Sequence, residues 1–163
     1  MKAAGQKLPA LEARQPLTVI EDLVPGKGPL GGIYSGLQAA SHELSIAVAC
    51  DMPLLCVPLL RRLCLLADGY DVVISTRQGR LQPLHAVYRR SCGEAIRDEI
   101  QAGRLKVISF LHAVRVRYVN EDEWTRYDKE GLSFFNVNTE EDLMRASYLL
   151  KHNVVDTNPE TTV

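Results

Sequence analysis

Four polar side chains stand where they could bind a divalent cation and a phosphorylated ligand. Asp22 follows the apolar stretch LTVI, Asp51 follows the longer apolar stretch LSIAVAC, and Asn136 and Asn138 stand in FFNVN. Mg²⁺ in proteins takes one or two carboxylates and completes its shell with water and substrate phosphates. The local sequence explains Asp51 equally well as a helix cap or turn former before Pro53.

The glycine-rich segment 25–32, PGKGPLGG, is a second candidate for phosphate binding. Its four glycines and two prolines predict a loop, and N–H groups at the start of the following helix favour anions. The Walker A pattern G-x-x-x-x-G-K-[ST] fails because Gly28 follows Lys27. The string GKGPLG fits G-x-G-x-x-G without the usual acidic ribose partner, so a plain turn-rich connection stays open as the alternative.

His85 and the four cysteines are interpreted as structural. A histidine on a strand is more often a partly buried core residue than a catalyst. The cysteines form no C-x-x-C pair and have no paired histidine spacing, which excludes the usual zinc signature. We interpret them as small buried side chains in a reducing compartment; they are Cys50, Cys56, Cys64 and Cys92.

Length and charge narrow the class of protein. The chain has 163 residues, which predicts a single domain over 1–163 with a frayed tail at 153–163. Its net charge of −1 leaves no basic excess for nucleic acid. No apolar run approaches the ~20 residues of a membrane helix, and the N-terminal residues contain no signal-peptide core. We therefore expect a cytoplasmic protein without nucleic-acid or membrane partners.

The order of the expected elements indicates an α/β fold. Apolar runs predict strands at 17–20, 44–50, 71–76, 82–88 and 114–120, with a strand or extended segment at 133–138. Helical patterns lie at 33–41, 57–69, 91–103, 105–113 and 139–153. The run IAVA does not alternate with polar residues, which predicts a strand covered on both faces. Together these features predict a mostly parallel, Rossmann-like sheet flanked by helices.

This fold would bring the candidate residues to one edge. Ligands of open α/β sheets bind outside the carboxyl ends of the strands, where Asp22, Asp51 and the two asparagines are expected. Local signals also predict helix boundaries, with Ser91 and Thr139 (or Asn138) as N-caps.

Four segments together resemble a known family. VIEDLVPGKGPLGGIYSGL, ACDMP, QPLHAVY and FFNVNTEEDL occur in the order typical of molybdenum cofactor guanylyltransferases, which are nucleotidyltransferases of the nucleotide-diphospho-sugar transferase type. The resemblance extends from about Leu17 to Leu143. It implies Mg²⁺-dependent transfer of GMP from GTP to molybdenum-molybdopterin with release of pyrophosphate. It also implies molybdoenzymes or cofactor-delivery proteins as partners.

The resemblance also implies roles for individual residues. Asp51 matches the family aspartate that binds Mg²⁺ and nucleotide, and Asp22 matches an acidic residue that contacts GTP. Asn136 and Asn138 match amides near the metal and the second substrate.

The sequence departs from the family at its start. The family opens with a strand and a loop of the form G-G-x-S-x-R-M-G-x-x-K, which grips the nucleotide phosphates, and MKAAGQKLPALEARQ contains no such pattern. Since phosphoryl transfer depends on electrostatic positioning, we expect this chain alone to be a poor or inactive guanylyltransferase. The missing first strand should also expose a sheet edge.

Two other functions are compatible with the same sequence. One keeps the fold and transfers cytidylyl groups to a related pterin, or nucleotidyl groups to a sugar phosphate. The other is non-catalytic binding of a cofactor or of a partner protein.

Overall fold

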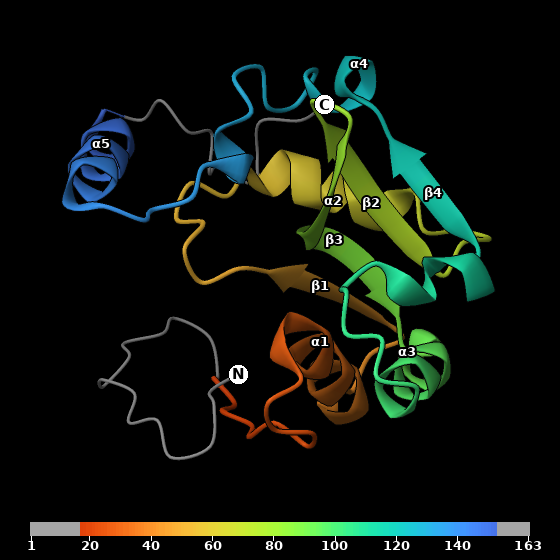
Figure 1. Ribbon diagram of the computed structural model, residues 1–163. Helices are drawn as coiled ribbons and strands as arrows, with labels where there is room; N and C mark the ends of the chain where they lie inside the picture. The colour runs from red at the N-terminus through yellow and green to blue at the C-terminus, as the bar shows by residue number, and fades with distance from the viewer. Residues whose placement is uncertain (1–16, 153–163) are drawn as a thin grey trace. The chain divides into compact units, whose positions relative to one another are not determined.

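The computed structural model describes residues 17–152 and divides the chain into two compact units (Figure 1). Unit 1 is formed by Met1–Ser45 and Arg89–Val114, and unit 2 by Ile46–Tyr88 and Arg115–Val163. The tail expected at 153–163 lies outside the described residues.

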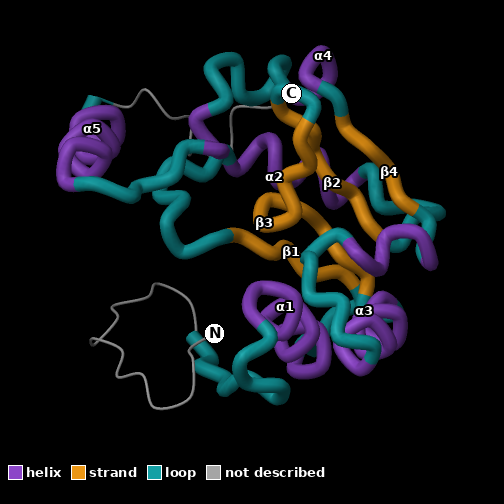
Figure 2. The backbone as a smooth tube through the Cα atoms, in the orientation of Figure 1, coloured by secondary structure: helices purple, strands orange, loops and turns teal. Residues whose placement is uncertain are grey.

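Unit 1 is built on helices α1 and α3, which lie side by side (Figure 2). They are α1, Gly28–Ala39, and α3, Cys92–Gln101, and they are followed by the 3-10 helix η1, Ser109–Ala113. The unit's buried side chains come from all three elements, and they include Leu30, Ile33, Leu37, Ile96, Ile100 and Phe110. The helix predicted over 105–113 is thus confirmed only in its last turn.

Helix α1 begins earlier than predicted, so the loop predicted over 25–32 is wrong for its second half. Pro29 fits the first helical turn, where its missing N–H needs no partner. Gly31 is buried, and a Cβ there would lie 2.9 Å from the Cβ of Lys27 and 3.2 Å from the carbonyl oxygen of Val24. Glycine therefore serves close packing at this position rather than loop flexibility.

The strand predicted at residues 17–20 is also wrong. These residues belong to no strand, and Leu17 and Val19 are 55% and 46% exposed. A buried strand needs neighbours for its backbone groups, and this segment is not one of the strands in the sheet of the described residues.

Most of a four-stranded sheet lies in unit 2. Only a few terminal residues of two of its strands belong to unit 1. The strands are β1, Leu44–Val48; β2, Val72–Arg77; β3, Arg80–Arg89; and β4, Val116–Val119. Their order across the sheet is β1-β3-β2-β4. Strand β2 pairs with β4 in parallel and with β3 in antiparallel orientation.

The direction of β1 follows from two backbone hydrogen bonds. Ala49 N–H donates to Leu84 O at 3.1 Å, and Arg90 N–H donates to Glu43 O at 2.8 Å, so β1 and β3 run in opposite directions. Strands β1, β2 and β4 therefore share one direction, and β3 is reversed between them (Figure 1). The α/β fold is confirmed, with a mixed sheet.

The hairpin between β2 and β3 explains the reversed strand. Gln78 and Gly79 have φ values of 50° and 71°, the left-handed values that a two-residue hairpin turn requires. The string RQGR between two apolar runs predicts a turn at this point, and the structure confirms it. The turn does not fix the place of β3 in the sheet. That β3 lies between β1 and β2 depends on its pairing with β1, which is distant in the sequence.

Strand β1 is less covered than its apolar sequence predicts. Ile46 is 43% exposed and Val48 is 40% exposed. In the described residues β1 stands at one end of the sheet order, so it has a neighbour on one side only. The prediction of a strand covered on both faces is therefore wrong.

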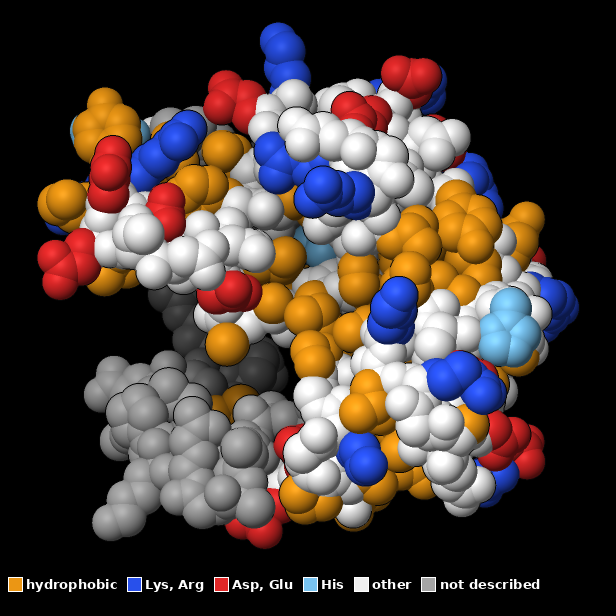
Figure 3. Space-filling view, in the orientation of Figure 1, with side chains coloured by type: hydrophobic (Ala, Val, Ile, Leu, Met, Phe, Trp, Pro, Cys, Tyr) orange, Lys and Arg blue, Asp and Glu red, His pale blue; other side chains and the backbone are white. Residues whose placement is uncertain are grey.

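The remaining elements of unit 2 are helical. They are α2, Val57–Leu65; α4, Glu121–Trp124; η2, Leu132–Phe134; and α5, Glu140–Lys151. Helix α2 turns the buried side chains of Leu59 and Leu63 inward. Helix α5 buries only Ala146 completely, and Figure 3 shows hydrophobic side chains exposed on it.

The two expected N-caps differ in outcome. Thr139 Oγ1 accepts a hydrogen bond from Asp142 N–H at 3.1 Å, and the Asp142 carboxylate accepts one from Thr139 N–H at 3.0 Å, which completes a capping box. Ser91 stands at the start of α3 with helical φ and ψ, and its side chain accepts no capping hydrogen bond. Within residues 17–152, none of the helices combines the length and apolarity needed to cross a membrane.

Candidate functional site

Asp51 lies in the turn that follows β1, at the carboxyl edge of the sheet. Its side chain is half-buried, and its Oδ1 atom is buried without a hydrogen-bond partner among the described residues. A buried carboxylate oxygen without a partner is costly, because a charge removed from water needs a compensating group. One oxygen of Asp51 therefore has no compensating hydrogen bond among the described residues.

The asparagine segment contacts Asp51 directly. Val137 N–H donates a 2.8 Å hydrogen bond to the carbonyl oxygen of Asp51, although the two residues are far apart in sequence. Asn136 and Asn138 flank Val137, and both are exposed. The structure thus brings three of the four predicted site residues to one place, where the chain after β1 meets the chain before α5 (Figure 1).

Asp128 holds the loop that leads into this segment. Its buried carboxylate accepts hydrogen bonds from Leu132 N–H at 3.0 Å and from Ser133 N–H at 2.8 Å. Ser133 Oγ in turn accepts a 2.8 Å hydrogen bond from Cys56 N–H. Cys56 lies five residues after Asp51. These hydrogen bonds therefore connect the chain that follows Asp51 to the loop that precedes the asparagine segment.

Apolar packing supports the same junction. Leu54 and Ala146 form a buried cluster, and four partly buried side chains pack against it: Leu132, Phe135, Val137 and Leu149. The Asp142 carboxylate also accepts a 3.1 Å hydrogen bond from Asn138 N–H. That bond is the main reason that the pKa of Asp142 is lowered. The backbone of the asparagine segment is therefore held from both ends.

Asp22 belongs to unit 1 and is half-buried. The residue beside it, Leu23, donates its N–H to Ser35 Oγ at 2.9 Å, and Ser35 Oγ–H donates to Gly31 O at 2.8 Å. Asp22 is thus placed beside a segment anchored on α1. Its role in nucleotide binding stays a prediction.

The donor set near Asp51 limits which metals would fit. Within residues 17–152, no group of three or more His, Cys, Asp and Glu side chains is arranged to hold a metal ion. A Zn²⁺ site built from protein ligands alone would need such a group. Mg²⁺ fits, because one carboxylate oxygen with substrate phosphates and waters can fill its coordination shell.

The cysteines near the site differ from one another in burial. Cys56 is buried, as the sequence predicts. Cys50, which precedes Asp51, is exposed, so the prediction of a buried side chain is wrong there.

His85 lies on β3 and packs against Phe134, two residues before Asn136. It has no exposed surface, and its ring centroid lies 4.7 Å from that of Phe134. Burial lowers its pKa from 6.5 to about 4, although the charge of Asp128 acts in the opposite direction. The imidazole is therefore neutral near pH 7.

Sequence reasoning missed the residues that hold the loop, namely Asp128 and Ser133. The signal for the first was present: Asp128 precedes Gly131 by three residues, and Gly131 has the left-handed φ of 65° that marks a turn. The composition of EDEWTRYDKEG otherwise indicates only a polar excursion from the sheet. No local signal pairs Ser133 with a backbone N–H that lies 77 residues away.

The fold identifies a class of protein. The crystal structure of 2-C-methyl-D-erythritol 4-phosphate cytidylyltransferase from Thermus thermophilus superposes with a TM-score of 0.60 over 88% of this chain and 79% of that one. At 17% identity this likeness concerns the fold alone. The protein therefore shares the fold of that cytidylyltransferase.

The sequence identifies the family within that class. The family model described as the MobA-like NTP transferase domain matches residues 3–116, and the chain belongs to this family. A crystal structure titled molybdopterin-guanine dinucleotide biosynthesis protein A, from Archaeoglobus fulgidus, superposes with a TM-score of 0.70 at 30% identity, over 82% of this chain and 68% of that one.

Two curated relatives share one name, which refers to the molybdenum cofactor. "Probable molybdenum cofactor guanylyltransferase" of Pelotomaculum thermopropionicum is 40% identical over 136 residues, 83% of this chain and 66% of that protein. The protein of the same name from Bacillus licheniformis is 39% identical over 130 residues, 77% and 64% of the two chains. This chain thus spans just under two thirds of the length of either relative.

Proposed function

We propose that this protein transfers GMP from GTP to molybdenum-molybdopterin and so forms the guanine dinucleotide form of the molybdenum cofactor. Membership of the MobA-like NTP transferase family and the names of two relatives at 39–40% identity support this reaction. The observation that carries it is the junction of Asp51 and Val137, which joins a carboxylate with a buried, unpartnered oxygen to the asparagine segment.

Each site residue has a proposed role. Asp51 would hold Mg²⁺ through its carboxylate, and Asp22 would contact the nucleotide. Asn136 and Asn138 present exposed amides, which can donate to the phosphate of molybdopterin. Bound Mg²⁺ would neutralise charge on the GTP phosphates.

The reaction needs no side-chain nucleophile. A terminal phosphate oxygen of molybdopterin forms a bond to the α-phosphorus of GTP. The bond from that phosphorus to the bridging oxygen breaks, and pyrophosphate leaves with the electron pair. The protein's contribution is to hold the two substrates in line and to offset the charge of the transferring group.

Nucleotide binding tests the role of Asp51. GTP at 100 times its dissociation constant should stabilise the protein by about 2.7 kcal/mol, and Mg²⁺ should enlarge the shift in melting temperature. Asp51→Asn should abolish the Mg²⁺-dependent part of that shift. The matched control is Asp68→Asn, an exposed aspartate after α2, which should behave as wild type. An unchanged Mg²⁺ response in Asp51→Asn would contradict the proposed role.

Substrate choice needs a separate measurement. Guanylylation of molybdopterin is followed by the release of pyrophosphate, with CTP in place of GTP as the comparison. Asn136→Ala and Asn138→Ala should lower transfer while leaving GTP binding intact. Equal turnover with both nucleotides would refute a preference for guanine.

A further inference from the structure

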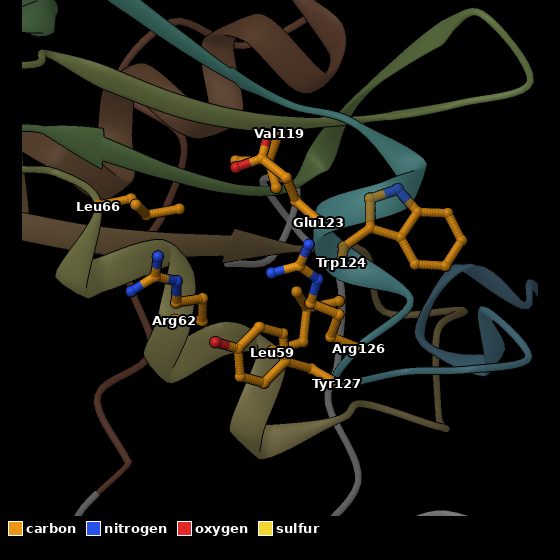
Figure 4. Close-up of a pocket in the computed structure, with 8 residues that line it drawn as sticks. All are labelled: Leu59, Arg62, Leu66, Val119, Glu123, Trp124, Arg126 and Tyr127. Carbon is orange, nitrogen blue, oxygen red and sulfur yellow. The ribbon is translucent and has the colours of Figure 1, made fainter.

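Unit 2 contains a second polar site that the proposed reaction does not use. It is a small pocket with a volume of about 40 Å³ (Figure 4). Its walls come from α2, the end of β4, α4 and the turn after α4. The lining residues are Leu59, Arg62, Leu66, Val119, Glu123, Trp124, Arg126 and Tyr127. None of the four candidate site residues is among them.

Two guanidinium groups line this pocket without a bonded partner of their own. Within residues 17–152, the side chains of Arg62 and Arg126 form neither a hydrogen bond nor an ion pair. Arg62 is half-buried and Arg126 is exposed, and they come from two different elements. Two unpaired like charges on one pocket repel each other, so an anion between them would lower the electrostatic energy.

The carboxylate in the pocket is already engaged. Glu123 forms an ion pair with Arg117 and accepts a hydrogen bond from Asn120 N–H. Burial alone would raise the pKa of Glu123, but these two contacts, together with the nearby charge of Arg62, hold it below its usual value. Since Arg117 neutralises Glu123, the two remaining guanidinium groups leave the pocket positively charged.

The size and lining of the pocket narrow the ligand. A water needs roughly 10–15 Å³ of such space, so the pocket has room for about three waters or one tetrahedral anion. Guanidinium groups bind the oxygens of phosphate in a fixed fork geometry, and the half-buried ring of Tyr127 carries a hydroxyl that offers a further donor. A whole nucleotide does not fit.

We propose that this pocket binds a single phosphate group, either as free inorganic phosphate or as the end of a phosphate ester. Arg62 from α2 and Arg126 from the turn after α4 contact its oxygens. The site lies at the β4 end of the sheet order and is separate from the Asp51 site, since β1 stands at the other end.

The single tryptophan of the chain reports on this pocket. Trp124 lines it, and the sequence contains no other tryptophan. Titration with sodium phosphate at constant ionic strength should change its fluorescence in a saturable manner. Arg62→Gln and Arg126→Gln should each weaken binding about tenfold, the effect of losing one hydrogen bond to a charged group.

Two control variants show whether phosphate binding depends on this pocket. Arg61→Gln removes the same charge from the neighbouring position of α2, outside the lining, and should change binding less than about twofold. Asp51→Asn should bind phosphate as wild type does. Glycerol 3-phosphate is the second probe: tighter binding of it would identify an ester as the ligand, and tighter binding of inorganic phosphate would identify the free ion. Either result supports the site.

Three results would overturn the proposal. The first is a fluorescence change that does not saturate or that sodium chloride reproduces. The second is phosphate binding that persists unchanged in the double variant Arg62→Gln, Arg126→Gln. The third is loss of phosphate binding in Asp51→Asn, which would place the anion at the other site.

Discussion

The buried imidazole of His85 predicts how stability depends on pH. The residue has no exposed surface, and neither ring nitrogen has a hydrogen-bond partner among the described residues. Burial lowers its pKa from 6.5 to about 4, so the folded protein keeps the ring neutral in a range where the unfolded chain protonates it. Between these two pKa values, the unfolded state therefore binds a proton at His85 and the folded state does not.

The size of this effect follows from the two pKa values. The stabilisation is fully present above about pH 6.5 and is lost as the pH falls toward 4. Between pH 7.5 and pH 5.0, the free energy of unfolding should decrease by about 2 kcal/mol from this residue alone. That is a large fraction of the 5–15 kcal/mol by which domains are usually stable.

Urea unfolding followed by Trp124 fluorescence measures the change, because Trp124 lies in the same unit as His85. His85→Leu places an apolar side chain of similar size against Phe134 and removes the titrating group. It should lose less than half as much stability as wild type over the same pH range. The control His42→Gln removes an exposed histidine and should keep the full wild-type loss.

The reasoning is refuted if His85→Leu retains the wild-type loss of stability. It is also refuted if NMR titration finds the His85 ring protonating near pH 6.5. The carboxylates with lowered pKa values, Glu99 among them, make stability depend on pH mainly below about pH 4.5, and they are common to both proteins.

Three further substitutions test what holds the fold together. Asp128→Ala leaves two backbone N–H groups without their acceptor, one of them the buried N–H of Ser133, and should cost about 3 kcal/mol in urea unfolding. Arg104 bonds both oxygens of Glu99 and lowers its pKa from 4.5 to about 2, so the pair stabilises above pH 4.5 and the effect is lost toward pH 2. Arg104→Gln should thus melt below wild type at pH 7, by a margin that narrows on acidification from pH 4.5 to pH 3. Gly131→Ala forces a Cβ into a φ of 65° at 3.1 Å from the indole ring and should cost about 1–2 kcal/mol by the same unfolding assay.

Each of these substitutions has a matched control. Asp68→Ala removes an exposed aspartate, and a loss equal to that of Asp128→Ala would disprove the buried-acceptor argument. Gly103→Ala has a similar φ of 73° but meets nothing within 4 Å, so an equal cost at Gly131 would show that the ring contact adds nothing. For the acid pair, Arg80→Gln removes an exposed arginine whose side chain forms no ion pair among residues 17–152, and it should give a pH-independent difference.

Elements with strong local signals were predictable from the sequence. The cap at Thr139 and the turn at Gln78 and Gly79 were foreseen because their hydrogen bonds join residues close in the chain. The strand predicted over 71–76 from its apolar run is confirmed at Val72–Arg77. The α/β class follows from the alternation of such segments.

Elements that depend on distant partners were mispredicted. LTVI has the composition of a strand, but it is not part of the sheet of the described residues, and Leu17 and Val19 are largely exposed. GPLGG has the composition of a loop, but Gly31 allows α1 to pack closely against Val24. In both cases the tertiary environment outweighs local preference, which is worth only a fraction of a kcal/mol to about 1 kcal/mol per residue.

The candidate site likewise has some features that local sequence predicts and others that depend on distant partners. In the sequence, a carboxylate follows an apolar run at Asp51, and two asparagines precede the last helix. The folded structure alone shows that Val137 N–H reaches the Asp51 carbonyl at 2.8 Å, and that Asp51 Oδ1 is buried without a partner among the described residues. The reason is physical. Apolar runs and caps act through neighbouring residues, whereas this contact depends on a distant loop that Asp128 and Ser133 hold against the chain following β1.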